Sequence, residues 1–333
     1  MNRRTFFATG GFGALAASAL GQAPPAGGAA GSGGRGGSGG RGRGGPVLPD
    51  TPPGQTIPLW SGHSPGGESI ELEAPPLTWP ANHRNITTPM IGVYRAPNPD
   101  GTSVLVCPGG GYVGLTMPTE GSLIAAKFNA DRTTIFVLIY RLPGMGWNNR
   151  SNVPLQDVQR AMRIVRSRAD EFGIDPKRLG VMGFSAGGHL AGSLATCYAE
   201  HVYDPVDAAD SQSAKPAFAA LGYPVITLKS PYAHVGSRDA LLGPNASDAL
   251  IASRSLETLV TADTVPCFLV HGMDDRLVPV ENSLMMVTAL RDKKVKCEAH
   301  FFQQGAHGFG VGVAGQPNQH WPGMFSDWMR AIA

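Results

Sequence analysis

The chain has 333 residues, which is enough for one large α/β domain with a sizeable core. Its formal net charge is +2, but positions 1–46 carry five arginines and no acid, so the rest of the chain holds 22 basic and 25 acidic residues. This larger part is mildly acidic, which argues against a basic face for nucleic acid.

Residues 1–23 have the pattern of an export signal. Arg3 and Arg4 open a twin-arginine-like sequence, and a weakly apolar, glycine-rich stretch follows at 12–20. That stretch is too short to span a bilayer, so we expect no stable membrane insertion. The pattern predicts a periplasmic or extracellular protein, with signal cleavage near residue 19 or residue 23.

Residues 24–50 are rich in Gly, Arg and Ser, which predicts a flexible linker. The same composition occurs in RNA-binding segments, but RNA would be an unusual partner for an exported protein. Residues 51–333 then form the folded domain, and we expect no nucleic-acid partner for it.

Short apolar runs alternate with helical patterns along this domain. Strands are predicted at 103–107, 134–140, 179–184, 218–225, 267–271 and 296–302, and helices at 120–129, 154–172, 186–199, 280–293 and 321–332. The alternation indicates an α/β fold, a mostly parallel sheet with helices on both faces. Residues 57–60 and 91–96 are expected to form antiparallel edge strands. No large cap domain is evident, and 227–264 is the best candidate for a small lid.

The most informative motif is Gly183-Phe184-Ser185-Ala186-Gly187. It fits the G-x-S-x-G nucleophile elbow, and the predicted strand before it and helix after it are the context that the elbow requires. A serine at the tip of this sharp turn has its hydroxyl clear of the sheet, and glycines allow strand and helix to approach closely. Ser185 is therefore the candidate nucleophile.

A serine hydroxyl needs a base, usually a histidine oriented by a carboxylate, and in this arrangement the acid and the histidine follow the serine in that order. Asp274 and Asp275 lie in a polar loop after the strand at 267–271, and His307 lies in a loop after the last strand. The local pattern H-G-x-x-D-x-x-V-P favours Asp275 over Asp274. His271, at the end of a strand, is interpreted as structural.

Acyl transfer also needs donors for the developing oxyanion. Ala186 follows the nucleophile and is expected to supply one N–H group. Gly110 and Gly111 lie in the loop after the strand at 103–107 and are expected to supply the other. The alternative of a phosphate-binding loop fails, because neither Lys-Ser nor Lys-Thr follows the glycines.

No cofactor is expected, and no histidine or cysteine spacing suggests a metal site. The four cysteines fall in predicted strands and in the helix after the elbow, so we expect buried free thiols. They are Cys107, Cys197, Cys267 and Cys297.

With these motifs the chain resembles α/β-hydrolase-fold serine esterases, in particular the secreted bacterial branch of acetylxylan esterases and related esterase/lipase-like proteins. The resemblance extends over residues 55–330 and includes Pro108-Gly109-Gly110-Gly111-Tyr112, Glu120-Gly121 and Gly305-Ala306-His307-Gly308-Phe309. It implies a triad of Ser185, Asp275 and His307, and thus a catalytic domain at 51–333.

The resemblance implies hydrolysis of a small-molecule or oligosaccharide ester, with acetylated plant polysaccharide as the expected substrate. A peptidase of the prolyl-oligopeptidase type and an esterase for aromatic, feruloyl-type esters are the alternatives. Five residues are candidates for the substrate pocket, and each could instead serve packing: Tyr112, Trp147, Tyr223, Tyr232 and His234.

Overall fold

The structure is a computed structural model that describes residues 52–68, 70–71 and 83–332. The predicted export signal at 1–23 and linker at 24–50 lie outside the described residues. Within them, no helix is both long enough and apolar enough to cross a membrane.

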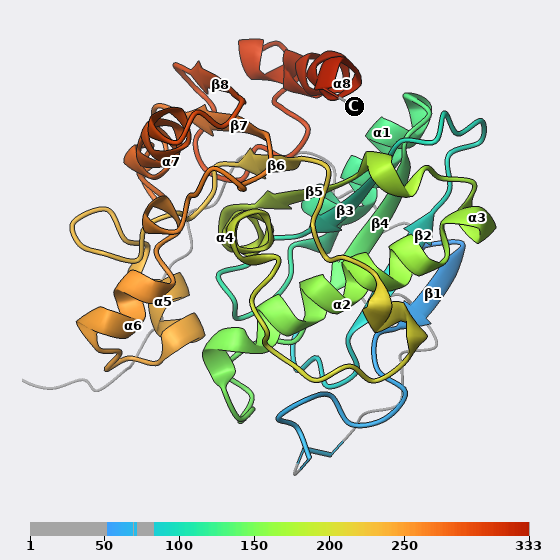
Figure 1. Ribbon diagram of the computed structural model, residues 1–333. Coiled ribbons are helices and arrows are strands. Elements are labelled where there is room, and N and C mark those ends of the chain that lie inside the picture. The colour runs from blue at the N-terminus through green and yellow to red at the C-terminus, as the bar shows by residue number, and fades with distance from the viewer. Residues whose placement is uncertain (1–51, 69, 72–82, 333) are drawn as a thin grey trace, which may run out of the picture. The chain divides into compact units, whose positions relative to one another are not determined.

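One eight-stranded sheet organises the domain, in the order β1-β2-β4-β3-β5-β6-β7-β8 (Figure 1). The strands are β1 (Gln55–Pro58), β2 (Met90–Tyr94), β3 (Ser103–Cys107), β4 (Thr134–Ile139), β5 (Leu179–Phe184), β6 (Ala219–Gly222), β7 (Cys267–Gly272) and β8 (Cys297–Phe302). β1 and β2 pair antiparallel, as do β2 and β4, and the remaining pairs are parallel. The predicted mostly parallel sheet is confirmed.

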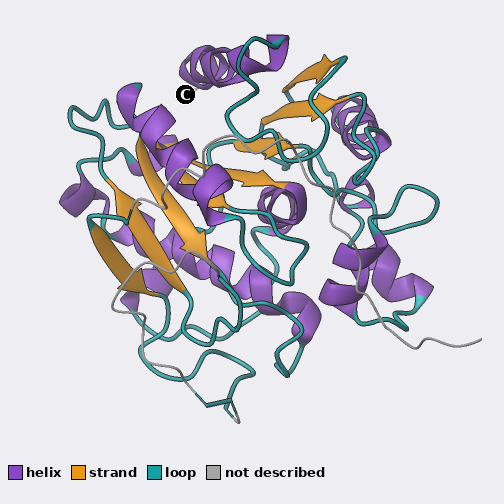
Figure 2. Ribbon diagram, turned by 180° about the vertical axis from the view of Figure 1, so that it is seen from behind, coloured by secondary structure: helices purple, strands orange, loops and turns teal. Residues whose placement is uncertain are grey.

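Helices cover both faces of the sheet. They are α1 (Leu123–Ala130), α2 (Val153–Ser167), α3 (Ala169–Phe172), α4 (Ser185–Cys197), α5 (Val235–Leu242), α6 (Asp248–Ser253), α7 (Glu281–Asp292) and α8 (Trp321–Ile332). α2 and α4 lie over the face turned toward the viewer in Figure 1, and Figure 2 shows α1 over the opposite face. α1 packs against α8, where the rings of Phe128 and Trp321 are 5.9 Å apart.

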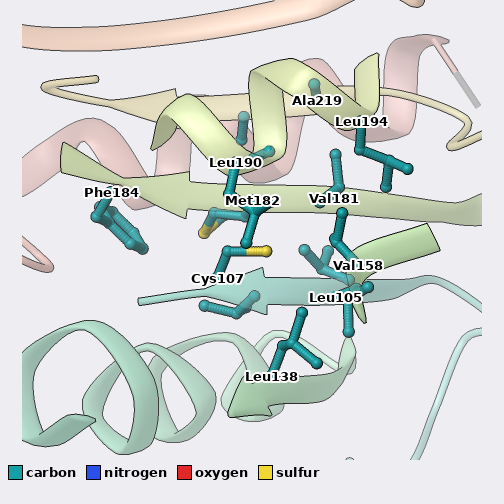
Figure 3. Packing of buried hydrophobic residues seen from close by; sticks show 14 of the residues in the cluster. Leu105, Cys107, Leu138, Val158, Val181, Met182, Phe184, Leu190, Leu194 and Ala219 are labelled. Carbon is teal, nitrogen blue, oxygen red and sulfur yellow. The ribbon is translucent and has the colours of Figure 1, made fainter. Parts of the chain in front are cut away.

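Apart from Ser103 and Thr134 at their starts, the central strands β3, β4 and β5 are built of apolar residues and glycine, because both of their faces are covered. Every residue of β3, β4 and β5 is buried. Figure 3 shows side chains of β3 and β5, among them Leu105 and Met182, packed in one cluster with Leu190 of α4. This core fixes the strand ends that carry the loops of the site.

Several predicted elements differ from the structure. β2 lies between β1 and β4, so of the two predicted edge strands β1 alone lies at an edge, and β8 forms the other edge of the sheet. Strand order depends on tertiary pairing, which the local sequence does not determine. The predicted helix at 154–172 is interrupted at Arg168, whose non-helical backbone separates α2 from α3. β6 ends at Gly222 because Tyr223 has a φ of +35°, outside the range of a strand.

The lid candidate at 227–264 contains the short helices α5 and α6 and the single 3-10 turn η5 (Leu256–Thr258). All four cysteines are free thiols as expected, but only Cys107 and Cys267 are fully buried.

Candidate active site

The strand order creates a switch point between β3 and β5. The chain leaves β3 for β4 on one side and then returns to β5 on the other. In open α/β sheets, ligands bind outside the carboxyl ends of the strands at such a point. The loop containing Gly110 follows β3, and Ser185 follows β5 directly.

Ser185, His307 and Asp275 come together at this edge. His307 Nε2 lies 2.9 Å from Ser185 Oγ, and His307 Nδ1 lies 2.7 Å from Asp275 Oδ2. Asp275 is buried, whereas the His307 side chain is 17% exposed. A histidine that contacts a serine hydroxyl with one ring nitrogen and a carboxylate with the other is the arrangement that activates a serine nucleophile.

The elbow holds Ser185 in a strained conformation, with φ at +53°. A side chain at Gly183 would collide with the backbone of Gly187, and one at Gly187 would collide with the backbone of Cys107. These glycines therefore permit the close approach of β5, α4 and β3 that presents the hydroxyl.

The structure separates the two acids of the β7 loop. Asp275 Oδ1 accepts the N–H groups of Leu277 and Val278, both at 2.9 Å, and Oδ2 faces His307. Asp274 is exposed and accepts the N–H of Ala306 at 2.8 Å. Burial alone would raise the pKa of Asp275, but its hydrogen bonds with His271 and His307 outweigh burial and hold the pKa below its usual range.

His271, which the sequence predicts to be structural, also contacts this carboxylate. Its Nε2 lies 3.3 Å from Asp275 Oδ2 and 3.0 Å from the carbonyl oxygen of Val278. Its Nδ1 lies 2.8 Å from Ser283 Oγ. A proton on Nε2 satisfies both oxygens, so the ring helps to hold Asp275 Oδ2, the oxygen that also faces His307. The sequence signal was the histidine of H-G-x-x-D itself.

The loop after β3 has the conformation expected of an oxyanion loop. Gly110 has φ at +130° and Gly111 at +66°, values that favour glycine. The N–H of Gly109 is already bound to Glu120, at 2.7 Å, which leaves Gly110 and Gly111 as the candidate donors of this loop. Ala186 lies in the first turn of α4, where N–H groups have no partner within the helix.

A second buried carboxylate, Glu120, lies behind these residues. It belongs to the π-helical turn η1 (Pro118–Ser122), where the sequence predicted the start of a helix. Tyr223 Oη donates to Glu120 at 2.9 Å and accepts the N–H of Gly310 at 3.0 Å. In the sequence, Glu120 is identifiable only through the Glu120-Gly121 pair that the chain shares with the family it resembles.

Of the five pocket candidates, two turn into the protein interior near the site. Tyr112 is 2% exposed and bonds to His189 at 2.8 Å, so its side chain does not line an open surface. Tyr223 is fully buried beneath His307, with ring centroids 5.1 Å apart, because its hydroxyl is bound in the interior. Both support the site from within.

Two further candidates contact other regions. Trp147 is buried, donates to the carbonyl of Leu142 and stacks on Arg141. Tyr232 is 37% exposed and lines a depression beside α7. Among the described residues, neither side chain is hydrogen-bonded to, or stacked on, Ser185, Asp275 or His307.

His234 remains beside the site. Its Nδ1 lies 2.8 Å from Ser237 Oγ and accepts the N–H of Ser237, so its own proton resides on Nε2. A Cβ added at Gly111 would lie 3.9 Å from Ser237 Oγ, which places this pair against the candidate oxyanion loop. Burial, and after it the charge of His307, lowers the pKa of His234.

Comparison with known proteins identifies the lineage. Residues 94–290 match the sequence profile of the BD-FAE family, a range that includes Ser185 and Asp275 and ends before His307. The chain is 32% identical over 243 residues to an acetylxylan esterase of Xylanibacter ruminicola, covering 72% of this chain and 47% of that protein. It is 39% identical over 208 residues to endo-1,4-beta-xylanase B of Butyrivibrio fibrisolvens, covering 62% of this chain and 32% of that protein. This chain thus spans less than half the length of either relative.

The solved structure of an acetyl ester-xyloside bifunctional hydrolase from Caldicellulosiruptor lactoaceticus superimposes with a TM-score of 0.72 at 34% identity. The match covers 86% of this chain and 98% of that one. The expected α/β-hydrolase fold is thereby confirmed. Among the described residues, no group of three or more His, Cys, Asp or Glu side chains is arranged to hold a metal ion.

Proposed function

Because this chain belongs to the BD-FAE family of α/β hydrolases, we propose that it is a serine carboxylic ester hydrolase that removes short acyl groups, acetyl above all, from carbohydrate. The observation that carries the proposal is the continuous set of contacts from Asp275 through His307 to Ser185, beside a glycine loop. The enzyme is expected to work through an acyl-enzyme intermediate.

In the first half-reaction, Ser185 Oγ attacks the ester carbonyl carbon while His307 Nε2 accepts the serine proton. Asp275 stabilises the imidazolium through the contact at Nδ1. The N–H groups of Gly110 or Gly111, together with that of Ala186, stabilise the negative charge on the carbonyl oxygen, at about 3–4 kcal/mol per donor.

Collapse of this tetrahedral intermediate breaks the bond to the alcohol, which leaves with the proton held on His307. A water molecule then enters, His307 removes its proton, and the hydroxide attacks the acyl carbon. A second tetrahedral intermediate releases the carboxylic acid and restores Ser185. The partial exposure of His307 gives water access to the base.

Two observations support a sugar as the alcohol half. The relatives carry the names acetylxylan esterase, xylanase and acetyl ester-xyloside hydrolase. His234, beside the oxyanion loop, keeps a proton on Nε2 and so has a donor to offer a sugar hydroxyl. Export through the predicted twin-arginine signal at 1–23 would bring the enzyme to polymeric plant material.

The test is acetate release from acetylated xylo-oligosaccharides, followed by mass spectrometry before and after incubation with purified protein. Parallel assays use p-nitrophenyl acetate, methyl ferulate and a proline-linked peptide amide. We expect loss of acetyl groups from the oligosaccharides and turnover of p-nitrophenyl acetate. Faster turnover of the ferulate ester or the peptide amide would contradict the assignment.

A further inference from the structure

Glu120 lies between the loop of the oxyanion donors and the loop of the histidine. It is 3% exposed, and none of the ion pairs between described residues includes it. A buried carboxylate without a cationic partner is costly unless its oxygens are hydrogen-bonded. Its two oxygens are bound on opposite sides, and each bond leads to a different part of the site.

The first bond leads to the oxyanion loop. Glu120 Oε2 accepts the N–H of Gly109 at 2.7 Å. Gly109 has little room to move, because a Cβ there would lie 2.7 Å from the carbonyl oxygen of Phe184 and 2.9 Å from Ser185 Cβ. The carboxylate therefore holds the start of the loop against the elbow, one residue before Gly110.

The second bond leads to the histidine loop. Glu120 Oε1 accepts the hydroxyl proton of Tyr223, whose oxygen accepts the N–H of Gly310. The Tyr223 ring also packs edge-on against His307 and against Phe309, with ring centroids 5.1 Å and 4.6 Å apart. Through Tyr223, Glu120 thus holds the segment that carries the base.

We propose that Glu120 is a positioning residue that fixes the oxyanion loop and the His307 loop relative to each other, so that donor and base act on the same tetrahedral intermediate. The inference rests on the proposed esterase function. A carboxylate suits this task because both oxygens accept, and such charge-assisted bonds are shorter and stronger than neutral ones. A small displacement of the oxyanion loop moves its N–H donors away from the carbonyl oxygen. These donors stabilise the negative charge that develops on this oxygen in the transition state.

The test compares Glu120→Ala, Tyr223→Phe and the double variant on p-nitrophenyl acetate, with rates expressed per active site titrated by a fluorophosphonate. We expect each single variant to lose about 10-fold or more in kcat while KM changes less than about threefold, because transition-state interactions are lost. The double variant should lose little more than the poorer single variant, since both changes break one network.

Two further measurements distinguish positioning from loss of stability. Affinity for a trifluoromethyl ketone, which mimics the oxyanion, should fall in parallel with kcat. The matched control is Asp157→Asn, a change at a buried carboxylate bound to Trp60 and Arg141 away from the site. We expect this control to lower the melting temperature and leave kcat per active site unchanged.

Glu120→Gln provides a milder variant if Glu120→Ala does not fold. Its amide oxygen can still accept the Gly109 N–H, but its NH₂ group faces Tyr223 and removes the acceptor of the tyrosine proton. We expect kcat between those of the wild type and Glu120→Ala. Wild-type kcat in both Glu120 variants, or losses that multiply in the double variant, would overturn the inference. If the wild type neither turns over p-nitrophenyl acetate nor reacts with the fluorophosphonate, the proposed function itself fails.

Discussion

Replacing Asp275 by Asn is expected to disable the site by placing His307 in the wrong tautomer. Asp275 Oδ1 accepts two backbone N–H groups, from Leu277 and Val278. An asparagine amide satisfies them only with its oxygen at that position, which turns its NH₂ group toward His307 Nδ1. Nδ1 must then accept a hydrogen bond from this NH₂ group and stay unprotonated, so the ring proton resides on Nε2, which cannot take the proton of Ser185.

The expected loss in kcat is about 10⁴-fold, or about 5 kcal/mol of transition-state stabilisation. Asp274→Asn is the matched control, because its amide oxygen can still accept the exposed N–H of Ala306. The kcat of Asp274→Asn should fall about 10-fold at most, which is the equivalent of one hydrogen bond. The assay is kcat on p-nitrophenyl acetate with circular dichroism of both variants. An equal or larger loss in Asp274→Asn would refute the assignment of the acid.

Four further outcomes are expected. Ser185→Ala should lower ester turnover about 10³-fold or more in a protein that still melts cooperatively, and near-normal turnover would remove Ser185 as the nucleophile. Burial lowers the pKa of His83 and of His189 to about 4, against about 6.5 for an unfolded histidine, so the unfolded state binds more protons below about pH 6.5. Stability should therefore fall as pH drops from about 6.5 toward about 4, and thermal unfolding of His189→Gln across this range should show a shallower fall than in the wild type. His234→Ala should lower kcat/KM on acetylated xylosides by about 2- to 12-fold, the equivalent of one hydrogen bond, and leave p-nitrophenyl acetate unaffected; equal losses on both would remove His234 from sugar recognition. Among p-nitrophenyl esters, kcat/KM should be higher for acetyl than for octanoyl. An increase in kcat/KM with chain length, equivalent to about 0.8 kcal/mol of binding free energy per added CH₂, would instead indicate a lipase-like acyl channel.

Much of the fold follows from local patterns in the sequence. The apolar runs at Ser103–Cys107 and Leu179–Phe184 and the helical pattern at Trp321–Ile332 have in the structure the bounds that were predicted. These segments are uniformly buried or strongly amphipathic, so periodicity identifies them clearly. The place of β2 within the sheet depended on pairing between distant segments, which periodicity does not encode.

The same distinction applies to the site. Ser185, Asp275 and His307 lie in motifs with a fixed order along the chain, and the structure brings them together. Glu120 and Tyr223 are separated by 103 positions and meet only through the fold. For Tyr112, the sequence placed the residue beside the glycine loop, but the direction of its side chain depends on its φ of +61° and on His189.

The central claim is that Ser185 carries the acyl group during turnover. The most direct measurement is acid-quenched peptide mass spectrometry of the enzyme mixed with p-nitrophenyl acetate, with Ser185→Ala as the control. The account predicts an acetyl group on the peptide that contains Ser185 in the wild type and no acetyl-enzyme in the variant. An acetyl group on another residue, or unchanged turnover in the variant, would contradict it.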